Sequence, residues 1–152
     1  MKLQLTIFKC AKCANIFKAP DIAHGAYGEF LLRSVDDELA YLDAIADETY
    51  QEVNLMVKAN LRMIGKTPNV VADILRKTYG AIACDSDSSG QPYQIGRFPK
   101  CPGCNSNEME FWEPTEPPEF IEEPVRPVTH TRWSLLSRLE REERVDHVLS
   151  CI

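Results

Sequence analysis

The sequence lacks a long apolar run. No stretch of its 152 residues approaches the ~18 consecutive apolar residues of a membrane-spanning helix. Residues 1–9 also lack the apolar segment that marks a signal peptide. We therefore expect a cytoplasmic protein, and a reducing cytoplasm favours metal binding over disulfide bonds for paired cysteines.

Basic residues are also in short supply. The chain has 17 Lys and Arg against 23 Asp and Glu, which gives a formal net charge of −6. This acidic balance disfavours broad, charge-driven binding to nucleic acid or to anionic lipid. Hydrophobic residues make up 44% of the chain, which is enough for a real core.

Sequence patterns of the common enzyme chemistries are missing as well. There is no phosphate-cradling loop, no Ser-His-Asp arrangement and no paired-carboxylate motif. The three histidines, His24, His130 and His147, stand in no recognisable motif. The single cysteines Cys84 and Cys151 are expected to be small, buried apolar side chains. We expect a protein that is not an enzyme.

One segment partly matches a calcium-binding loop. Residues 85–90 place Asp, Asp, Ser and Gly at the first, third, fifth and sixth positions of an EF-hand loop. The twelfth position, which needs a bidentate glutamate, is Gly96. The pattern therefore favours a plain solvated turn.

What the sequence does contain is two Cys-x-x-Cys pairs, Cys10–Cys13 and Cys101–Cys104. The two-residue spacer lets both thiolates of a pair reach one ion, and two such pairs complete a tetrahedral cage. Zinc and iron share this four-thiolate geometry, so the spacing leaves the metal open. Four protein ligands leave no position for water, which indicates a structural rather than a catalytic site.

Strand-like segments flank both pairs. Residues 3–8 alternate between apolar and polar side chains and lead into the first pair, and residues 16–18 form the return strand, stopped by Pro20. Residues 93–98 lead into the second pair, and residues 108–112 lead away from it.

These features resemble a zinc ribbon. The resemblance rests on residues 8–18 and 99–106, each of which looks like one half of a ribbon. It implies one zinc ion held by Cys10, Cys13, Cys101 and Cys104 in a three-stranded ribbon built from residues 1–20 and 93–113. Many ribbons have a glycine after each pair, where this chain has Ala14 and Asn105.

The insertion between the two halves, residues 21–92, is predicted to be mainly helical. Apolar residues recur with a mean spacing of about 3.6 from residue 35 to residue 64, after a possible N-cap at Ser34 and before a stop at Gly65. One helix of that length would be about 45 Å long, so a break near Asp47 is an alternative.

The rest of the insertion is predicted to contain one more helix and short extended segments. That helix begins with Thr67 as N-cap and Pro68 as its first residue, and it ends at Gly80. Residues 24–28 and 81–92 are expected to be loops, and residues 29–33 a short strand.

The C-terminal part is predicted to be a linker and a helix. Residues 114–130 are rich in proline and glutamate, which indicates an extended linker. Residues 131–152 are expected to form a helix, from about 131 to 149. Its residues Trp133, Leu136 and Leu139 could dock in a groove of a partner protein or pack back on their own domain.

Charge is unevenly placed around the ribbon. Seven glutamates lie between residues 108 and 123 with no basic residue among them. The basic residues near the cysteine pairs are Lys9, Lys12, Lys18, Arg97 and Lys100. Two interpretations stay open: the acidic segment compensates the charge of its own ribbon, or it masks the ribbon or meets a basic partner.

The predicted fold class is thus α+β, a zinc ribbon with a large helical insertion, a linker and a C-terminal helix. The leading functional hypothesis is a zinc-stabilised adaptor that binds a protein partner through the C-terminal helix or through the helical insertion. A second is a nucleic-acid-associated ribbon protein that uses the ribbon cations and Trp112 as a stacking face. A third is a rubredoxin-like iron electron carrier.

Overall fold

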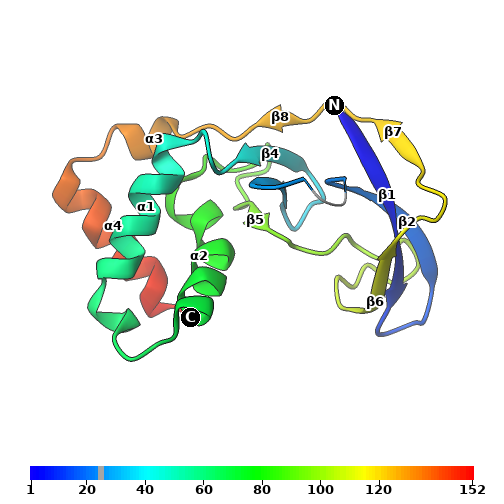
Figure 1. The fold of residues 1–152 in the computed structure, drawn as a ribbon, viewed down its shortest axis with the longest axis horizontal. Helices are drawn as coiled ribbons and strands as arrows, with labels where there is room; N and C mark the ends of the chain where they lie inside the picture. The colour runs from blue at the N-terminus through cyan, green and yellow to red at the C-terminus, as the bar shows by residue number, and fades with distance from the viewer. Residues whose placement is uncertain (24–25) are drawn as a thin grey trace.

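The structure is a computed structural model that describes residues 1–23 and 26–152. Within these residues it contains two open four-stranded sheets and four α-helices, which confirms the predicted α+β class. Figure 1 shows the cysteine-bearing sheet at one end, the helices at the other and the second sheet between them. Part of the loop predicted for residues 24–28, including His24, lies outside the described residues.

The first sheet is built around β1 (Lys2–Cys10). One edge of β1 pairs antiparallel with β2 (Ile16–Asp21). The other edge pairs with β6 (Met109–Pro114) near Cys10 and with β7 (Phe120–Glu122) near Lys2. The order β2-β1-β6 is the predicted three-stranded ribbon, to which β7 is an addition. Strand β2 continues through Pro20, so the expected stop at this residue is wrong. Because β2 is an edge strand, proline is tolerated there.

The second sheet has the order β5-β3-β4-β8. Strand β3 (Glu29–Arg33), predicted from the sequence, pairs antiparallel with β4 (Leu39–Asp43) and with β5 (Gln94–Ile95). Strand β8 (Arg126–Pro127) runs parallel to β4. The strand expected over residues 93–98 is therefore limited to two residues.

The single helix expected from residue 35 to residue 64 is wrong. The first part of this segment is β4, and the helix α1 (Glu48–Ala59) begins only after Asp47. The Asp47 carboxylate accepts hydrogen bonds from the backbone N–H groups of Thr49 and Tyr50, so the suggested break at Asp47 is confirmed. The 3₁₀ helix η1 (Leu61–Met63) follows α1.

Two predicted boundaries of helices are also corrected. The Ser34 hydroxyl accepts the N–H groups of Asp36 and Glu38, so it closes the β3–β4 turn and does not cap a helix. Helix α2 (Pro68–Ala83) begins as predicted, with the Thr67 hydroxyl accepting from Val70 N, but it continues past Gly80.

The proline-rich segment is extended but is not a free linker. Strands β7 and β8 within it pair with β1 and β4, so it runs across both sheets (Figure 1). After it, the expected C-terminal helix is two helices, α3 (Thr131–Ser134) and α4 (Arg138–Ser150). The break is set by Ser137, which forms a reciprocal capping box with Glu140.

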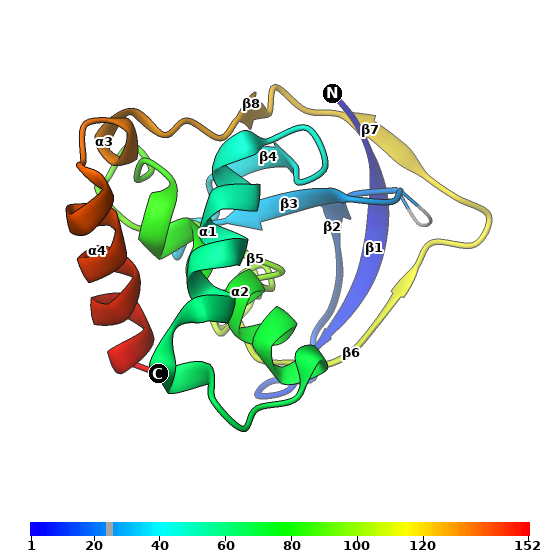
Figure 2. The same ribbon diagram turned by 60° about the vertical axis from the view of Figure 1, so that its left-hand side comes forward.

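The main core lies between the second sheet and the helices. Figure 2 shows α1 and α2 side by side in front of β3, with α4 beside them. Buried side chains come from all of these elements and include Leu32, Leu42, Val53, Val57, Leu75, Tyr79, Trp133, Val145 and Leu149. The C-terminal helices therefore pack on their own chain, and each large apolar side chain buried there contributes roughly 1.5–3 kcal/mol.

The two sheets meet at a buried arginine. Arg33 in β3 is 6% exposed, and its Nη2 donates to the Pro20 carbonyl in β2 over 3.0 Å. Burial lowers the pKa of the Arg33 guanidinium, and the nearby carboxylates of Asp37 and Asp21 partly offset that effect. Asp37 also accepts the backbone N–H of Lys100, which ties the β3–β4 turn to the second cysteine pair.

In the described parts of the chain, no helix is both long and apolar enough to cross a membrane.

Gly80 allows α2 to lie close to β5. A Cβ atom at this position would be 1.8 Å from the backbone oxygen of Tyr93, so Gly80→Ala must push the two elements apart. We expect a loss of about 3 kcal/mol in the free energy of unfolding, measured by urea denaturation. The control is Gly90→Ala, with φ +82° and no neighbour within 4 Å, which should cost only about 1 kcal/mol. Equal costs for the two variants would contradict the close-packing argument.

Candidate metal centre

The first cysteine pair lies in a tight turn between β1 and β2. Cys10 ends β1, its backbone N–H donates to the Asn15 carbonyl over 2.9 Å, and Ala14 N donates back to the Cys10 carbonyl. To close this turn, Ala14 adopts a left-handed conformation with φ 62°.

The second pair repeats the same turn. Cys101 N donates to the Ser106 carbonyl over 2.7 Å, and Asn105 N donates to the Cys101 carbonyl over 2.8 Å. Asn105 has φ 63°, the counterpart of Ala14. The two positions where many ribbons have glycine thus take the conformation that glycine favours, although neither is glycine.

Strand pairing brings the two turns together. Cys10 at the end of β1 lies opposite Met109 at the start of β6, and Ala11 N donates to the Glu108 carbonyl over 2.9 Å. The β6 strand follows directly after the second turn, so its pairing with β1 places that turn against the first. The helices α1 and α2, which lie between the two turns in the sequence, are at the other end of the molecule (Figure 1).

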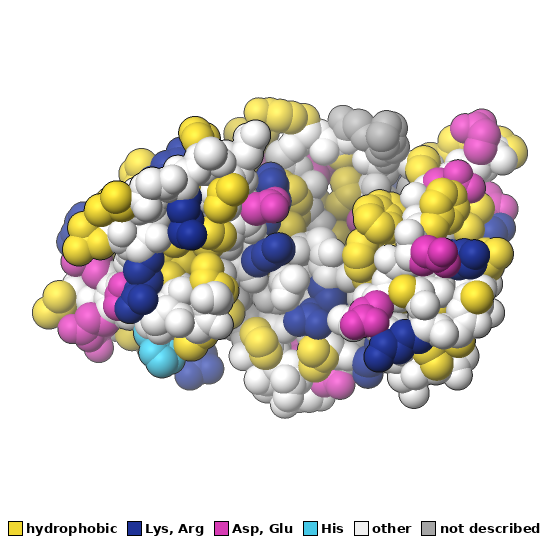
Figure 3. All heavy atoms as spheres, turned by 90° about the horizontal axis from the view of Figure 1, so that it is seen from below, with side chains coloured by type: hydrophobic (Ala, Val, Ile, Leu, Met, Phe, Trp, Pro, Cys, Tyr) yellow, Lys and Arg dark blue, Asp and Glu magenta, His cyan; other side chains and the backbone are white. Residues whose placement is uncertain are grey.

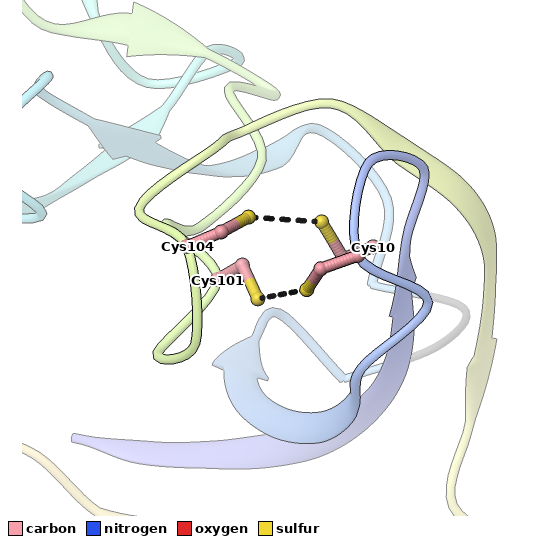
Figure 4. Close-up of side chains that lie close together, drawn as sticks. Cys10, Cys101 and Cys104 are labelled. Atoms are coloured by element: carbon pink, nitrogen blue, oxygen red, sulfur yellow. Dashed lines mark hydrogen bonds between the residues drawn. The ribbon is translucent and has the colours of Figure 1, made fainter.

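The four sulfur atoms face one another across the gap between the two turns, as Figure 4 shows for the labelled side chains. Cys10 Sγ lies 3.5 Å from Cys104 Sγ, and Cys13 Sγ lies 3.5 Å from Cys101 Sγ. All four lie within 4.8 Å of one another, and all are free thiols. A tetrahedron with metal–sulfur bonds of ~2.3 Å has sulfurs about 3.8 Å apart, so the cage is close in size to a four-thiolate metal site.

Backbone N–H groups in each turn point at the first sulfur of the pair. Lys12 N donates to Cys10 Sγ and Gly103 N donates to Cys101 Sγ, each over 3.4 Å. The amide of Asn15 lies 3.7 Å from Cys101 Sγ, which links the first turn to the second sulfur pair. Such donors stabilise thiolate over thiol, and the thiolate is the form that binds metal.

The pKa values of the thiols follow from these contacts. The N–H of Cys13 lowers the pKa of Cys10. Although burial raises it, the N–H groups of Cys104 and Gly103 lower the pKa of Cys101 to about 6. The N–H of Asn15 lowers the pKa of Cys13, but the crowded thiols of Cys101 and Cys104 raise it to about 12. Four adjacent thiolates repel one another, and a divalent cation at the centre removes that repulsion.

An aromatic cluster supports the turns from within the ribbon. The Phe8 ring stacks on the Phe17 ring, with their centroids 5.7 Å apart. It packs edge-to-face with the Phe98 ring, with their centroids 6.1 Å apart. The Phe98 ring also contacts the Trp112 ring, with their centroids 4.7 Å apart. Phe8, Phe17 and Trp112 come from the three paired strands, so the cluster fixes the register that brings the cysteines together.

This cage is the one place in residues 1–23 and 26–152 where three or more His, Cys, Asp or Glu side chains converge closely enough to share an ion. The structure places the other cysteines elsewhere. Cys84 is half-buried, and burial raises the pKa of its thiol, which makes it a poor nucleophile. The expectation of a buried side chain is wrong for Cys151, which is exposed on the last turn of the chain and whose thiol donates to the His147 carbonyl.

The segment that resembled a calcium loop has a structural role. The Asp85 carboxylate accepts from Thr129 Oγ1 and from the backbone N–H groups of Thr131 and Arg132. It therefore caps the start of α3 from a different part of the chain. Asp87 closes its own turn by accepting from Ser89 N and Gln91 N, as expected for a plain turn.

A partly buried polar cluster, which the sequence did not predict, surrounds His130. Its Nδ1 lies 2.9 Å from the Ala83 carbonyl, and its Nε2 lies 2.9 Å from Asp47 Oδ2 and 3.2 Å from the Tyr79 hydroxyl. Because Asp47 also caps α1, the cluster joins α1, α2 and α3. Nothing in the local sequence around His130 indicated these contacts, which join residues far apart in the chain.

Comparison of the chain with protein-family profiles, with curated proteins and with solved structures finds no match. The metal centre is therefore described from its own geometry alone.

Ala14 carries a conformational cost that glycine would remove. We expect Ala14→Gly to raise the free energy of unfolding by about 0.5–1 kcal/mol without changing the metal content. Ala11→Gly, in the same turn but without a positive φ, is the control and should lower stability by a few tenths. If both substitutions destabilise the zinc-loaded protein equally in urea titrations, the strain assigned to Ala14 is wrong.

Cys101 is fully buried in the cage, whereas Cys151 stands alone and exposed. We expect Cys101→Ser to release the metal and to lower the melting temperature by about 10 °C or more, because a structural zinc ion contributes ~10 kcal/mol or more in peptides. Cys151→Ser should keep the metal and change the melting temperature little. Elemental analysis and calorimetry of both variants measure this, and an unchanged Cys101→Ser protein would count against the cage.

Proposed function

We propose that this protein is a zinc-stabilised, non-enzymatic interaction protein that binds a protein partner through its helical end. The single observation that carries the proposal is the closed cage of four cysteine sulfurs within 4.8 Å, which joins the two ends of a long insertion. The insertion and the C-terminal helices then present the surface available for a partner.

A structural role for the ion is supported by the ligand set. Four cysteines fill a tetrahedral shell, so a bound ion has no open position for water or substrate. When zinc is bound there, Cys10, Cys13, Cys101 and Cys104 would hold it and the ion would contribute folding energy. Iron fits the same cage in size, and zinc is proposed because it is the usual ion of ribbons built this way.

The ribbon surface argues against the nucleic-acid hypothesis. Lys9 pairs with Glu110, Lys12 with Glu108 and Lys18 with Glu119, at N–O distances of 3.3, 3.9 and 2.7 Å. Figure 3 shows basic and acidic side chains side by side over the half that carries the ribbon. The acidic segment thus compensates its own ribbon, and few cations there remain for phosphate contacts.

The helical end offers an apolar surface instead. A groove of about 680 Å³ runs between α1 and α4. Its apolar lining residues are Leu55, Met56, Ala59, Leu61 and Val145, and its polar rim consists of Glu52, Asn60, Arg138, Glu142 and Asp146. Of these lining residues, Leu55 is 67% and Leu61 80% exposed. Apolar side chains gathered along a groove between two helices are the usual receptor for the apolar face of a third helix.

This surface differs from the one predicted on the C-terminal helix. Trp133 is 3% exposed, its indole donates to Glu52 over 3.1 Å, and Arg141 lies over its ring. Leu136 packs against the core. Of the three residues predicted to meet a partner, Leu139 alone is left exposed, so the proposed docking site moves to the α1–α4 groove.

The groove is tested by affinity purification of the tagged, zinc-loaded protein from its native cells with quantitative mass spectrometry. We expect Leu55→Lys with Leu61→Lys to lower the recovery of a specific protein about tenfold or more, because a bound partner would bury the two lysine charges away from water. The matched control is Ile16→Lys, at an equally exposed residue of β2, which should leave the recovery unchanged.

The proposal fails if no protein is lost selectively from the double variant, or if Ile16→Lys removes the same protein. Circular dichroism and metal content must match the parent protein in both variants, so that lost binding reports the surface rather than unfolding.

A further inference from the structure

A second cavity opens on a different face of α1, between the helices and the second sheet. It has a volume of about 830 Å³, within the range of ~300–1,000 Å³ that is typical of small-molecule sites. Its walls come from the β3 and β4 ends, from α1 and from α2, which lie side by side in Figure 2. The cavity shares no lining residue with the α1–α4 groove.

The floor of this cavity is apolar and reaches the core. Ala44, Val71 and Leu75 line it and are themselves buried, while Phe30, Tyr50 and Ala72 form its sides. At the mouth, Tyr27 is 87% and Ile45 61% exposed, so the apolar lining continues to the surface. The apolar surface thus runs from solvent to the centre of the helical layer.

The charged groups of the cavity are mainly basic, in a chain whose net charge is −6. Lys58, Lys66 and Arg76 line it, against one acidic residue, Glu29. The Glu29 carboxylate accepts a hydrogen bond of 2.6 Å from the Tyr41 hydroxyl, and Arg76 pairs with Asp73. Lys58 and Lys66 have no ion pair with any described residue, in contrast to the three paired lysines of the ribbon.

We propose that this cavity binds a small amphipathic anion, with an apolar body against Val71, Ala72 and Leu75 and one anionic head group near Lys58 and Lys66. The apolar floor supplies affinity, and the two unpaired ammonium groups select the sign of the head group. Medium-chain carboxylates have this chemistry. The inference is independent of the proposed protein partner, because the two sites lie on different faces of α1.

The test uses the zinc-loaded full chain and the fluorescent probe anilinonaphthalene sulfonate, which has an aromatic body and one anionic group. We expect saturable binding that decanoate displaces at a concentration at least tenfold lower than decyltrimethylammonium does. Decanoate should also shift the methyl NMR signals of Ala44, Val71 and Leu75 and leave those of the ribbon unchanged.

Variants locate the head group and the apolar body separately. Lys58→Glu with Lys66→Glu should weaken decanoate binding about tenfold or more, whereas Lys77→Glu, on α2 but outside the cavity, should change it less than twofold. Ala72→Trp should fill the cavity and abolish binding with little change in the circular dichroism spectrum.

Three results would overturn the proposal: no saturable probe binding, equal displacement by the cationic amphiphile, or full binding by the double lysine variant. Because the lysine substitutions are at the surface, they keep the test decisive even if Ala72→Trp does not fold.

Discussion

Four sulfur atoms from two distant turns lie within 4.8 Å of one another, and the arrangement of the ribbon depends on that constraint. The turns can meet only because β6 pairs with β1 in the register that sets Cys10 opposite Met109. That register is supported by the Phe8, Phe98 and Trp112 rings and by lysine–glutamate pairs across the ribbon. A bound divalent ion would remove the repulsion among the thiolates and so stabilise the contact between the two turns.

The helical layer rests on a different set of forces. Its core is apolar burial between α1, α2, α4 and the second sheet, and its polar joints are long-range contacts such as His130 with Asp47. The buried Arg33 side chain connects this layer to the ribbon through the Pro20 carbonyl. Loss of the metal is therefore expected to affect the ribbon first, because the helical core has its own buried surface.

The sequence was most informative where the signal is local. Cys-x-x-Cys spacing, the alternation in residues 3–8 and the Thr67–Pro68 helix start each depend on neighbours in the chain, and each predicted element is present. The helical period from residue 35 to residue 64 was misleading, because Leu39 and Leu42 fit a helical spacing yet belong to β4. This segment forms a strand because it pairs with β3 and β8. Such pairing involves residues far apart in the chain, so a local sequence pattern does not predict it. Gly80, read as a helix stop, is instead a packing contact with Tyr93, which is visible only in three dimensions.

The most direct test of the central claim is X-ray absorption spectroscopy at the metal edge of the purified protein, combined with its metal content. The account predicts one zinc ion per chain, bound by four sulfur atoms at a mean distance of ~2.3 Å. A shell that contains nitrogen or oxygen in place of sulfur, or a protein that is folded with no metal and with its four cysteines in disulfide bonds, would contradict it.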